Sequence, residues 1–351
     1  MKNRILLTSA LTGLVLTASA ASAQLSVSGN VNLSYKATGN DTTANKKESF
    51  DGFGKESQIN FGIKGKLNNG WDYAAGTSIE HDGTQQNGAS DQRGMFNENT
   101  YIDFINGDTT ITFGTDHIQN SDFSMANIAG FADFTELADG IGGSQSVALD
   151  NHLSPYNAFG AGLMQKTPVG IFSFLYAPSG TSNAAMTDIT DSAIKSQTGS
   201  ANAAYEVGFR GNLGLKGLDA AVFYNATDSE TSGEASKSGK QKGKLAAAKY
   251  TFGNNVTIAA EKGVNTATTG LDTTTKAYGV AYALSQNMTV GYTYAKTDVD
   301  AQSQDEKLQV ISLGYNLGPV LANAQYVKAE NVGNTAASDG EALYLSISTK
   351  F

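Results

Sequence analysis

The last ten residues, ALYLSISTKF (342–351), alternate apolar and polar side chains and end on an aromatic ring. This period of two predicts a β-strand rather than a helix. One face of the strand would be apolar and the other polar: Leu343, Leu345, Ile347 and Phe351 against Tyr344, Ser346, Ser348 and Lys350. Such a strand predicts a sheet that separates an oily environment from a watery one, as the wall of a membrane barrel does.

The N-terminus predicts that the chain is exported. Lys2 and Arg4 precede a mostly apolar run at 5–16, and small residues follow up to Ala23. This three-part pattern is typical of a secretory signal. A membrane anchor is disfavoured, because polar residues interrupt the run and it is shorter than the roughly 20 residues a spanning helix needs. We therefore expect a cleaved signal at 1–23 and one mature domain at 24–351.

Composition excludes some classes of protein. Cysteine is absent, so an exported chain of this size would fold without disulfides. Removing Lys2 and Arg4 leaves 22 basic and 33 acidic residues in the mature chain, a net charge of −11. Nucleic-acid binding is disfavoured by that sign. The histidines His81, His117 and His152 show no metal or triad spacing, so neither a metal site nor an enzyme is expected.

Turn signals divide the mature chain into sixteen segments of strand length. Seven short reversals lie near 68–70, 106–108, 167–170, 214–217, 253–255, 285–287 and 317–319. Eight longer polar connections alternate with them, near 38–53, 82–94, 118–152, 178–200, 229–242, 265–275, 297–306 and 330–340. The sequence therefore predicts an all-β, antiparallel up-and-down barrel of sixteen strands with its hairpins at one end and its loops at the other. A hairpin hidden in 118–152 or 178–200 would make eighteen.

Several segments show clean faces. Residues 25–35, 58–67, 203–213 and 276–294 place apolar side chains on one side and mainly Ser, Asn, Gln, Lys or Glu on the other. Tyrosines and phenylalanines gather near the strand ends, as interfacial girdles do. A soluble two-sheet sandwich would also alternate, so this alternative stays open at this point.

The mature chain resembles the general porins of the Gram-negative outer membrane, nearest to the alphaproteobacterial group. The resemblance rests on the export signal, on strands joined alternately by short turns and long loops, and on the terminal aromatic residue. The resemblance implies a homotrimer of barrels with a water-filled pore and a third loop folded inward. It also implies contact with outer-membrane lipid and lipopolysaccharide. In that family the C-terminal strand is the signal for the outer-membrane assembly machinery, and the matching positions here are Leu343, Leu345, Ile347 and Phe351.

The third loop, 118–152, is the candidate constriction. No Lys or Arg occurs between Gly94 and Gln165, so Asp and Glu carry the formal charge of the loop and its flanks. An acidic rim in a narrow aqueous passage attracts cations. The candidate rim residues are Asp116, Asp122, Asp133, Glu136, Asp139 and Asp150.

By the same resemblance a basic barrel wall faces this loop. The inward-reading candidates near mid-height are Lys64, Arg210 and Lys249, with Lys36 and Lys296 nearer the loop end. Because this wall is thin, the sequence predicts a weakly cation-selective diffusion channel for ions and small hydrophilic solutes. The alternatives are a channel selective for a sugar or another polar nutrient and, in another class, a surface adhesin or structural barrel.

No cofactor is expected. One further hypothesis concerns the acidic loop tips, which have oxygen ligands of the kind that Ca²⁺ and Mg²⁺ prefer. They would share these ions with anionic lipid headgroups: Asp298, Asp300, Asp305 and Glu306.

Overall fold

The computed structural model describes nine stretches of the chain: 24–41, 51–84, 96–114, 160–177, 204–227, 238–253, 255–269, 272–336 and 339–351. The predicted signal at 1–23 and the predicted third loop at 118–152 lie outside these residues, so their expected roles stay predictions. Among the described residues, no helix is both long and apolar enough to cross a membrane.

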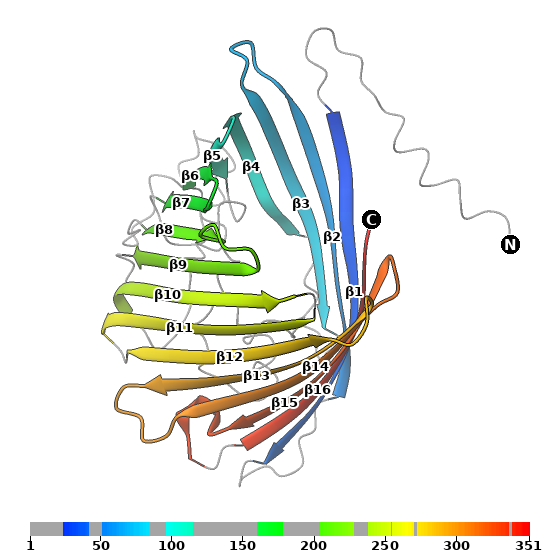
Figure 1. Cartoon of the computed structure of the whole chain (residues 1–351), viewed down its shortest axis with the longest axis vertical. Helices are drawn as coiled ribbons and strands as arrows, with labels where there is room; N and C mark the ends of the chain where they lie inside the picture. The colour runs from blue at the N-terminus through cyan, green and yellow to red at the C-terminus, as the bar shows by residue number, and fades with distance from the viewer. Residues whose placement is uncertain are drawn as a thin grey trace, which may run out of the picture.

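Sixteen antiparallel strands form one closed barrel in the described residues (Figure 1). Each strand pairs with its neighbours in sequence, and the last pairs with the first. The strands are β1 (Gln24–Asp41), β2 (Asp51–Lys66), β3 (Asp72–Thr84), β4 (Phe96–Asn106), β5 (Thr109–Gly114), β6 (Gly160–Thr167), β7 (Gly170–Ala177), β8 (Ala204–Gly211), β9 (Leu218–Thr227), β10 (Ser238–Phe252), β11 (Val256–Thr269), β12 (Thr273–Ala283), β13 (Met288–Val299), β14 (Glu306–Asn316), β15 (Val320–Glu330) and β16 (Asp339–Lys350). A short 3-10 helix, η4 (Val332–Asn334), lies between β15 and β16.

All seven predicted reversals join consecutive strands. Asparagine shapes three of them through its side chain. Asn69 Oδ1 accepts from the Trp71 amide at 3.1 Å, Asn212 Oδ1 from the Gly214 amide at 2.9 Å, and Asn316 Oδ1 from the Gly318 amide at 2.8 Å. Gly318 has φ of 90°, a conformation that favours glycine. The hairpin end is therefore built by local turn chemistry that the sequence displays directly.

Several loop boundaries differ from the prediction. The loop expected at 265–275 is shorter, because β11 continues to Thr269, β12 begins at Thr273, and Asn265 pairs with Thr273. This segment is rich in threonine, which suits strands, and its polar side chains on both faces hide the alternation. The strands thus extend further toward the loop end than the alternation indicated.

The two faces of the wall match the predicted alternation. Large apolar side chains are exposed on the outside of nearly every strand, for example Leu33 at 57%, Val207 at 48% and Ile347 at 58%. Residues of the opposite parity are mostly buried and include many Thr, Ser, Asn and Glu side chains. An apolar exterior around a polar interior is the arrangement of a membrane barrel. The continuous closed ladder excludes the two-sheet sandwich.

The barrel closes where β16 meets β1. Leu33 pairs with Ile347, and the Gly29 and Phe351 backbones exchange two hydrogen bonds of 3.0 Å each. Gly29 makes room for the terminal ring, because a Cβ at this position would lie 2.6 Å from Cζ of Phe351. Leu343, Leu345, Ile347 and Phe351 all face outward and are exposed. The strand predicted from the last ten residues is thereby confirmed as the closing strand, while its role as an assembly signal stays a prediction.

Candidate functional site: the inner wall of the barrel

Cross-strand register determines which side chains face the interior. On β8, Val207 and Phe209 point outward, so Glu206 and Arg210 point inward. The alternation is carried from strand to strand because directly paired residues share a face.

Two of the three predicted basic wall residues belong to one ion-paired cluster on the inner face. Arg210 donates to both carboxylate oxygens of Asp219, from Nε at 3.1 Å and from Nη2 at 2.8 Å. Lys249 Nζ lies 3.4 Å from Oδ2 of the same residue. Register brings the three together, since Lys249 pairs with Asp219 and Arg210 pairs with Ala221 on adjoining strands. One carboxylate thus offsets part of the charge of two cations.

The third predicted residue, Lys64, also lies on the inner face, on β2, where it is exposed. Its neighbour on the same face, Lys66, forms an ion pair of 2.6 Å with Asp72 across the first turn. Lys64, Arg210 and Lys249 all lie in the last residues before a turn, since their strands end at 66, 211 and 252. They therefore sit toward the hairpin end rather than near mid-height, where the sequence analysis placed them.

Lys296 is on the outer face, and its predicted inward position is wrong. It has the same parity as Tyr292 and Tyr294, while its neighbours Ala295 and Thr297 are buried. Its partner is Asp305, at 2.5 Å. The assignment failed because it followed the expectation of a basic wall instead of the alternation along β13.

Five carboxylates are buried on the inner face, and the sequence analysis proposed none of them as a pore residue. Asp103 accepts a 2.7 Å hydrogen bond from Thr112 Oγ1, and Glu306 accepts one of 2.9 Å from the Gly333 amide. Alternation could have identified them, because each has the parity opposite to exposed apolar neighbours. The five are Glu80, Asp103, Glu206, Glu261 and Glu306.

The predicted acidic rim cannot be compared in the same way. Its six residues lie in the part of the chain that the structure does not describe, between β5 and β6. Their role as the constriction, and the inward path of the loop, stay predictions: Asp116, Asp122, Asp133, Glu136, Asp139 and Asp150.

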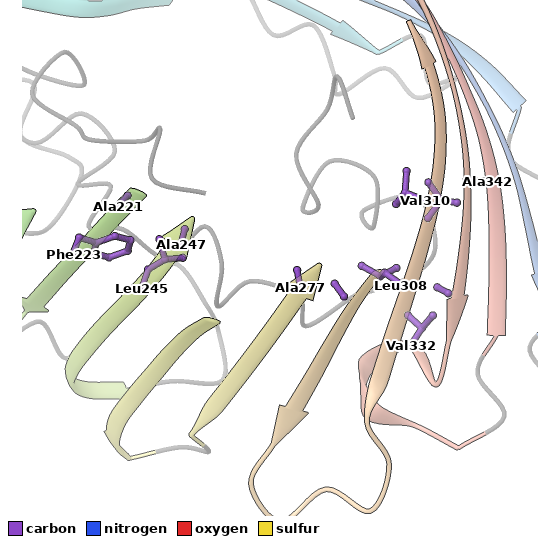
Figure 2. Packing of buried hydrophobic residues seen from close by; sticks show 12 residues of the cluster. Ala221, Phe223, Leu245, Ala247, Ala277, Leu308, Val310, Val332 and Ala342 are labelled. Atoms are coloured by element: carbon purple, nitrogen blue, oxygen red, sulfur yellow. The ribbon is translucent and has the colours of Figure 1, made fainter. Parts of the chain in front are cut away.

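Part of the inner wall is apolar (Figure 2). Phe223 and Leu245 pair across β9 and β10, and further along the wall Leu308 pairs with Ala329 and Val310 with Val327. These side chains are almost fully covered, with exposures from 0% for Val327 to 5% for Phe223. The sequence analysis missed this strip because it did not trace the faces of β9, β10 and β14, where Phe223, Leu245 and Leu308 interrupt the polar pattern of the inner face.

Metal binding at the loop tips is not tested by this structure. Within the described residues, no group of three or more His, Cys, Asp or Glu side chains is arranged to hold a metal ion. Two of the four proposed tip residues already have protein partners: Asp305 pairs with Lys296, and Glu306 accepts from Gly333. The Ca²⁺ or Mg²⁺ hypothesis stays a prediction.

Solved structures with the same fold are numerous, all at low sequence identity among those compared. An anion-selective porin from Comamonas acidovorans is 13% identical and aligns with a TM-score of 0.66, covering 94% of this chain and 100% of that one. A loop-deletion mutant of the Vibrio cholerae outer membrane protein OmpT is 12% identical with a TM-score of 0.65, covering 94% and 99%. A Rhodopseudomonas blastica porin mutant is 14% identical with a TM-score of 0.57, covering 93% and 100%.

The family assignment rests on the sequence rather than on the fold. No curated protein matches the chain. The family model of the Gram-negative porins matches residues 10–342, nearly the whole length. A closed sixteen-stranded barrel with an apolar exterior and a partly acidic inner wall agrees with that match. The chain belongs to the Gram-negative porin family.

Proposed function

We propose that this outer-membrane channel is a passive diffusion pore for ions and small hydrophilic solutes, with a weak preference for cations. The observation that carries the proposal is the charge of the inner wall. Carboxylates on β3, β4, β8, β11 and β14 point inward, and each is buried and interacts with other groups of the protein. The strongest basic pair, Arg210 and Lys249, shares the counter-charge of Asp219.

Charge on a channel wall acts strongly on an ion in the passage, because the low dielectric constant of the surrounding wall and membrane focuses the field into the water. Carboxylates along an aqueous passage lower the energy of an entering cation and raise that of an anion, as acidic rings do in cation channels. Asp219 reduces the opposing effect of Arg210 and Lys249, since their combined charge falls from about +2 to +1. The expected preference is weak because basic side chains remain at the hairpin end.

A substrate-selective channel is the second candidate within transport. A continuous row of aromatic side chains along the interior would favour it. Among the described residues, the inward aromatics Tyr101, Phe223 and Tyr344 lie on β4, β9 and β16, which are not adjacent. The non-specific pore is therefore the better supported of the two, and it requires no catalytic group.

The remaining parts of the proposal concern assembly. We expect a signal cleaved after Ala23, a homotrimer in the outer membrane, recognition of the strand ending at Phe351 by the assembly machinery, and no nucleic-acid partner. The exposed apolar exterior supports contact with lipid or with further copies of the barrel, because such a surface is not stable in water.

Single-channel recording in planar bilayers under a salt gradient tests the proposal. The wild-type protein should conduct, with a reversal potential whose sign indicates a preference for cations. In Asp219→Asn the potential should shift in the direction that indicates more anion permeation, because Arg210 and Lys249 then lose their shared counter-charge. Asp298→Asn is the matched control, since Asp298 is exposed on the outer face of β13.

Three outcomes would contradict the proposal at different levels. Absence of conductance would favour the adhesin or structural barrel. Conductance with an unchanged reversal potential in Asp219→Asn would mean that the cluster of Arg210, Asp219 and Lys249 does not influence the passage of ions. The triple variant Asp133→Asn, Glu136→Asn, Asp139→Asn tests the predicted loop separately, and an unchanged reversal potential there would remove those side chains from the constriction.

A further inference from the structure

The connection between β15 and β16 turns back onto the inner wall of the barrel. Its described part after β15 is residues 331–336, which contain η4. Asn331 follows the last residue of β15 in the left-handed conformation, with φ of 54°. Val332 is only 3% exposed and belongs to the apolar cluster of the inner wall, close to Leu308 (Figure 2). The segment therefore lies over the inner face at the loop end instead of extending away from the barrel.

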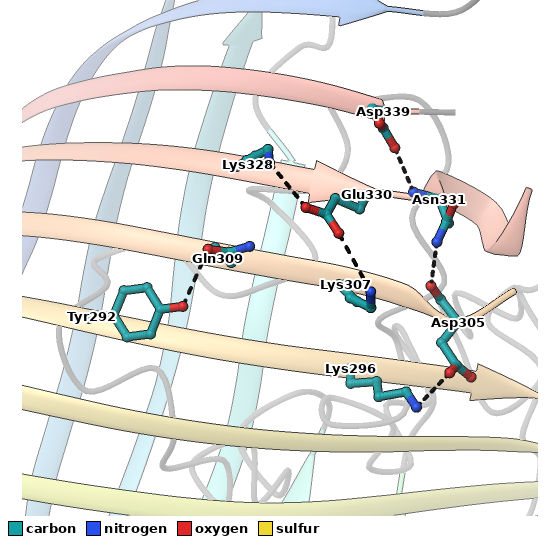
Figure 3. Close-up of polar contacts among 9 residues, drawn as sticks. All are labelled: Tyr292, Lys296, Asp305, Lys307, Gln309, Lys328, Glu330, Asn331 and Asp339. Atoms are coloured by element: carbon teal, nitrogen blue, oxygen red, sulfur yellow. Dashed lines mark hydrogen bonds and ion pairs between the residues drawn. The ribbon is translucent and has the colours of Figure 1, made fainter. Parts of the chain in front are cut away.

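Hydrogen bonds hold this segment to the wall. Asn334 Nδ2 donates to the backbone oxygens of Thr297, at 3.0 Å, and of Gln304, at 2.9 Å. The Asn331 side chain donates to the backbone oxygen of Asp305 at 3.1 Å (Figure 3). These acceptors lie on β13 and on the connection between β13 and β14. The segment is thus fastened to strands that precede it by about 30 residues in the chain.

The same segment covers an inward carboxylate. The Gly333 amide donates to Oε2 of Glu306, the first residue of β14, at 2.9 Å. Glu306 is 0% exposed, although its place on the strand directs it to the interior, and η4 contacts both β13 and β14. A carboxylate that accepts a backbone amide and is covered in this way is separated from the water of the passage. Glu306 is therefore an acidic residue near the mouth that the segment keeps from passing ions.

The docked conformation strains the backbone. Asn331 and Asn334 have φ of 54° and 57°, and Gly333 has φ of 65°. Non-glycine residues stay in this region only where the surrounding contacts hold them, and such strain gathers at elements that switch position. Asn334 Oδ1 is also buried without a hydrogen-bond donor among the described residues, which costs further free energy. A small number of contacts thus holds a strained segment in place.

We propose that residues 331–336 form a lid at the loop-end mouth of the pore, which is docked on the inner wall in this structure and covers Glu306. Release of the lid uncovers this carboxylate and opens the part of the mouth that the segment occupies. Conductance and cation permeation then rise together, because a carboxylate on a narrow aqueous passage attracts cations. This inference rests on the proposed pore, and it does not depend on the predicted path of loop 118–152.

Planar-bilayer recording of the full-length barrel with Asn334→Ala tests the lid. Alanine removes both Nδ2 hydrogen bonds and disfavours φ of 57°, so the docked position loses stability. The conductance should rise about 1.5-fold, and the reversal potential should shift in the direction that indicates more cation permeation. Asn334→Gly removes the same hydrogen bonds but tolerates the positive φ, so it should show both changes to a smaller degree. The matched control is Asn316→Ala in a turn at the hairpin end, which should leave both quantities unchanged.

Glu306→Gln separates the uncovered charge from the wider mouth. Glutamine keeps an acceptor for the Gly333 amide but carries no charge, so the lid stays docked. In this background Asn334→Ala should still raise the conductance but no longer shift the reversal potential. Such non-additivity measures the coupling between the two residues. An equal shift of the reversal potential in both backgrounds would overturn the role of Glu306.

A single thiol tests the position of the lid directly, because the chain contains no cysteine. Thr335→Cys places this thiol on an exposed residue of the segment. A cationic methanethiosulfonate reagent should then lower the conductance, since it adds a positive charge at the mouth. Thr274→Cys is the matched control. Thr274 lies on the outer face of β12, between the buried Thr273 and Thr275, so its modification should not change the conductance.

The outcomes separate the lid from the pore. Absence of conductance in the wild-type protein would contradict the proposed pore and the lid together. A conducting channel in which Asn334→Ala leaves the conductance unchanged, or lowers it, would overturn the lid alone. Equal effects of the reagent on Thr335→Cys and Thr274→Cys would do the same. The heat-modifiable mobility of each variant on gels checks that the barrel is folded.

Discussion

Two arcs of the outer surface share one backbone design and differ in chemistry. On β3 to β9, none of the described outward positions holds an Asp, Glu, Lys or Arg. A shallow groove of about 500 Å³ lies on this side, lined in part by Ile102, Phe113, Ala161 and Tyr176. On β10 to β15 seven lysines face outward: Lys242, Lys244, Lys262, Lys276, Lys296, Lys307 and Lys328.

The difference shows that alternation determines only which side of the wall a residue faces. What the residue meets there depends on the position around the barrel and along its axis. The uncharged arc is suited to an apolar environment throughout its described part. The lysine arc is suited to the boundary between apolar and anionic layers. A polar substitution should therefore have very different consequences on the two arcs.

The largest effect is expected from a charge introduced into the uncharged arc. Val207→Lys on β8 places an ammonium group at an exposed apolar position, where Val207 has 48% exposure. The free energy of unfolding should fall by about 2–4 kcal/mol, the cost of a lysine near the middle of a bilayer. Urea unfolding of the barrel in lipid vesicles measures it.

The matched change on the lysine arc is Gln309→Lys on β14, where Gln309 is outward and pairs with Lys328. Near the headgroups the cost should be only about 0–1 kcal/mol. Equal losses in the two variants would show that the arcs do not differ in their surroundings, and the comparison would fail.

The seam between the two arcs should respond next. Gly29→Ala adds a methyl group that would meet the Phe351 ring and the backbone carbonyl of Gln58. Overpacking of this kind costs about 1–3 kcal/mol, so the temperature at which the folded band disappears on gels should fall. Gly52→Ala is the control, because a Cβ at Gly52 has nothing within 4 Å. An unchanged transition in Gly29→Ala would mean that the terminal ring moves aside without loss.

Much of this architecture could be predicted from the sequence because its signals are local. Turn residues such as Asn212 and Asn316 act within three residues of themselves, and the alternation in 342–351 requires no knowledge of distant strands. Sixteen strands and their order follow from counting such signals. The loop boundary at 265–275 was wrong because threonine there occupies both faces.

The inner wall was harder to predict, because it depends on contacts between strands that are distant in sequence. Alternation in 203–213 placed Glu206 on the same polar face as Arg210, but the sequence analysis did not propose it as a pore residue. The partner that offsets the charge of Arg210, Asp219, required the register of β8 against β9 and of β9 against β10. The opposed lysines Lys262, Lys276 and Lys296 on the outer face likewise depend on register, because each lysine looks like an isolated charge in its own strand.

The smallest effect on stability, and the sharpest test of the lysine arc, is expected from Lys276→Glu. A carboxylate at this position would lie directly opposite Lys262 and Lys296, so two like-charge contacts become two attractive ones. Opposite charges in such cross-strand pairs contribute about 0.2–1 kcal/mol each. In detergent without lipid, the variant should therefore unfold at a slightly higher urea concentration than the wild-type protein. Lys55→Glu faces no lysine, because its partners are Leu33 and Gly83, and should show no such change. If Lys276→Glu unfolded at the same urea concentration as the wild-type protein or at a lower one, the opposed lysines would not repel each other measurably.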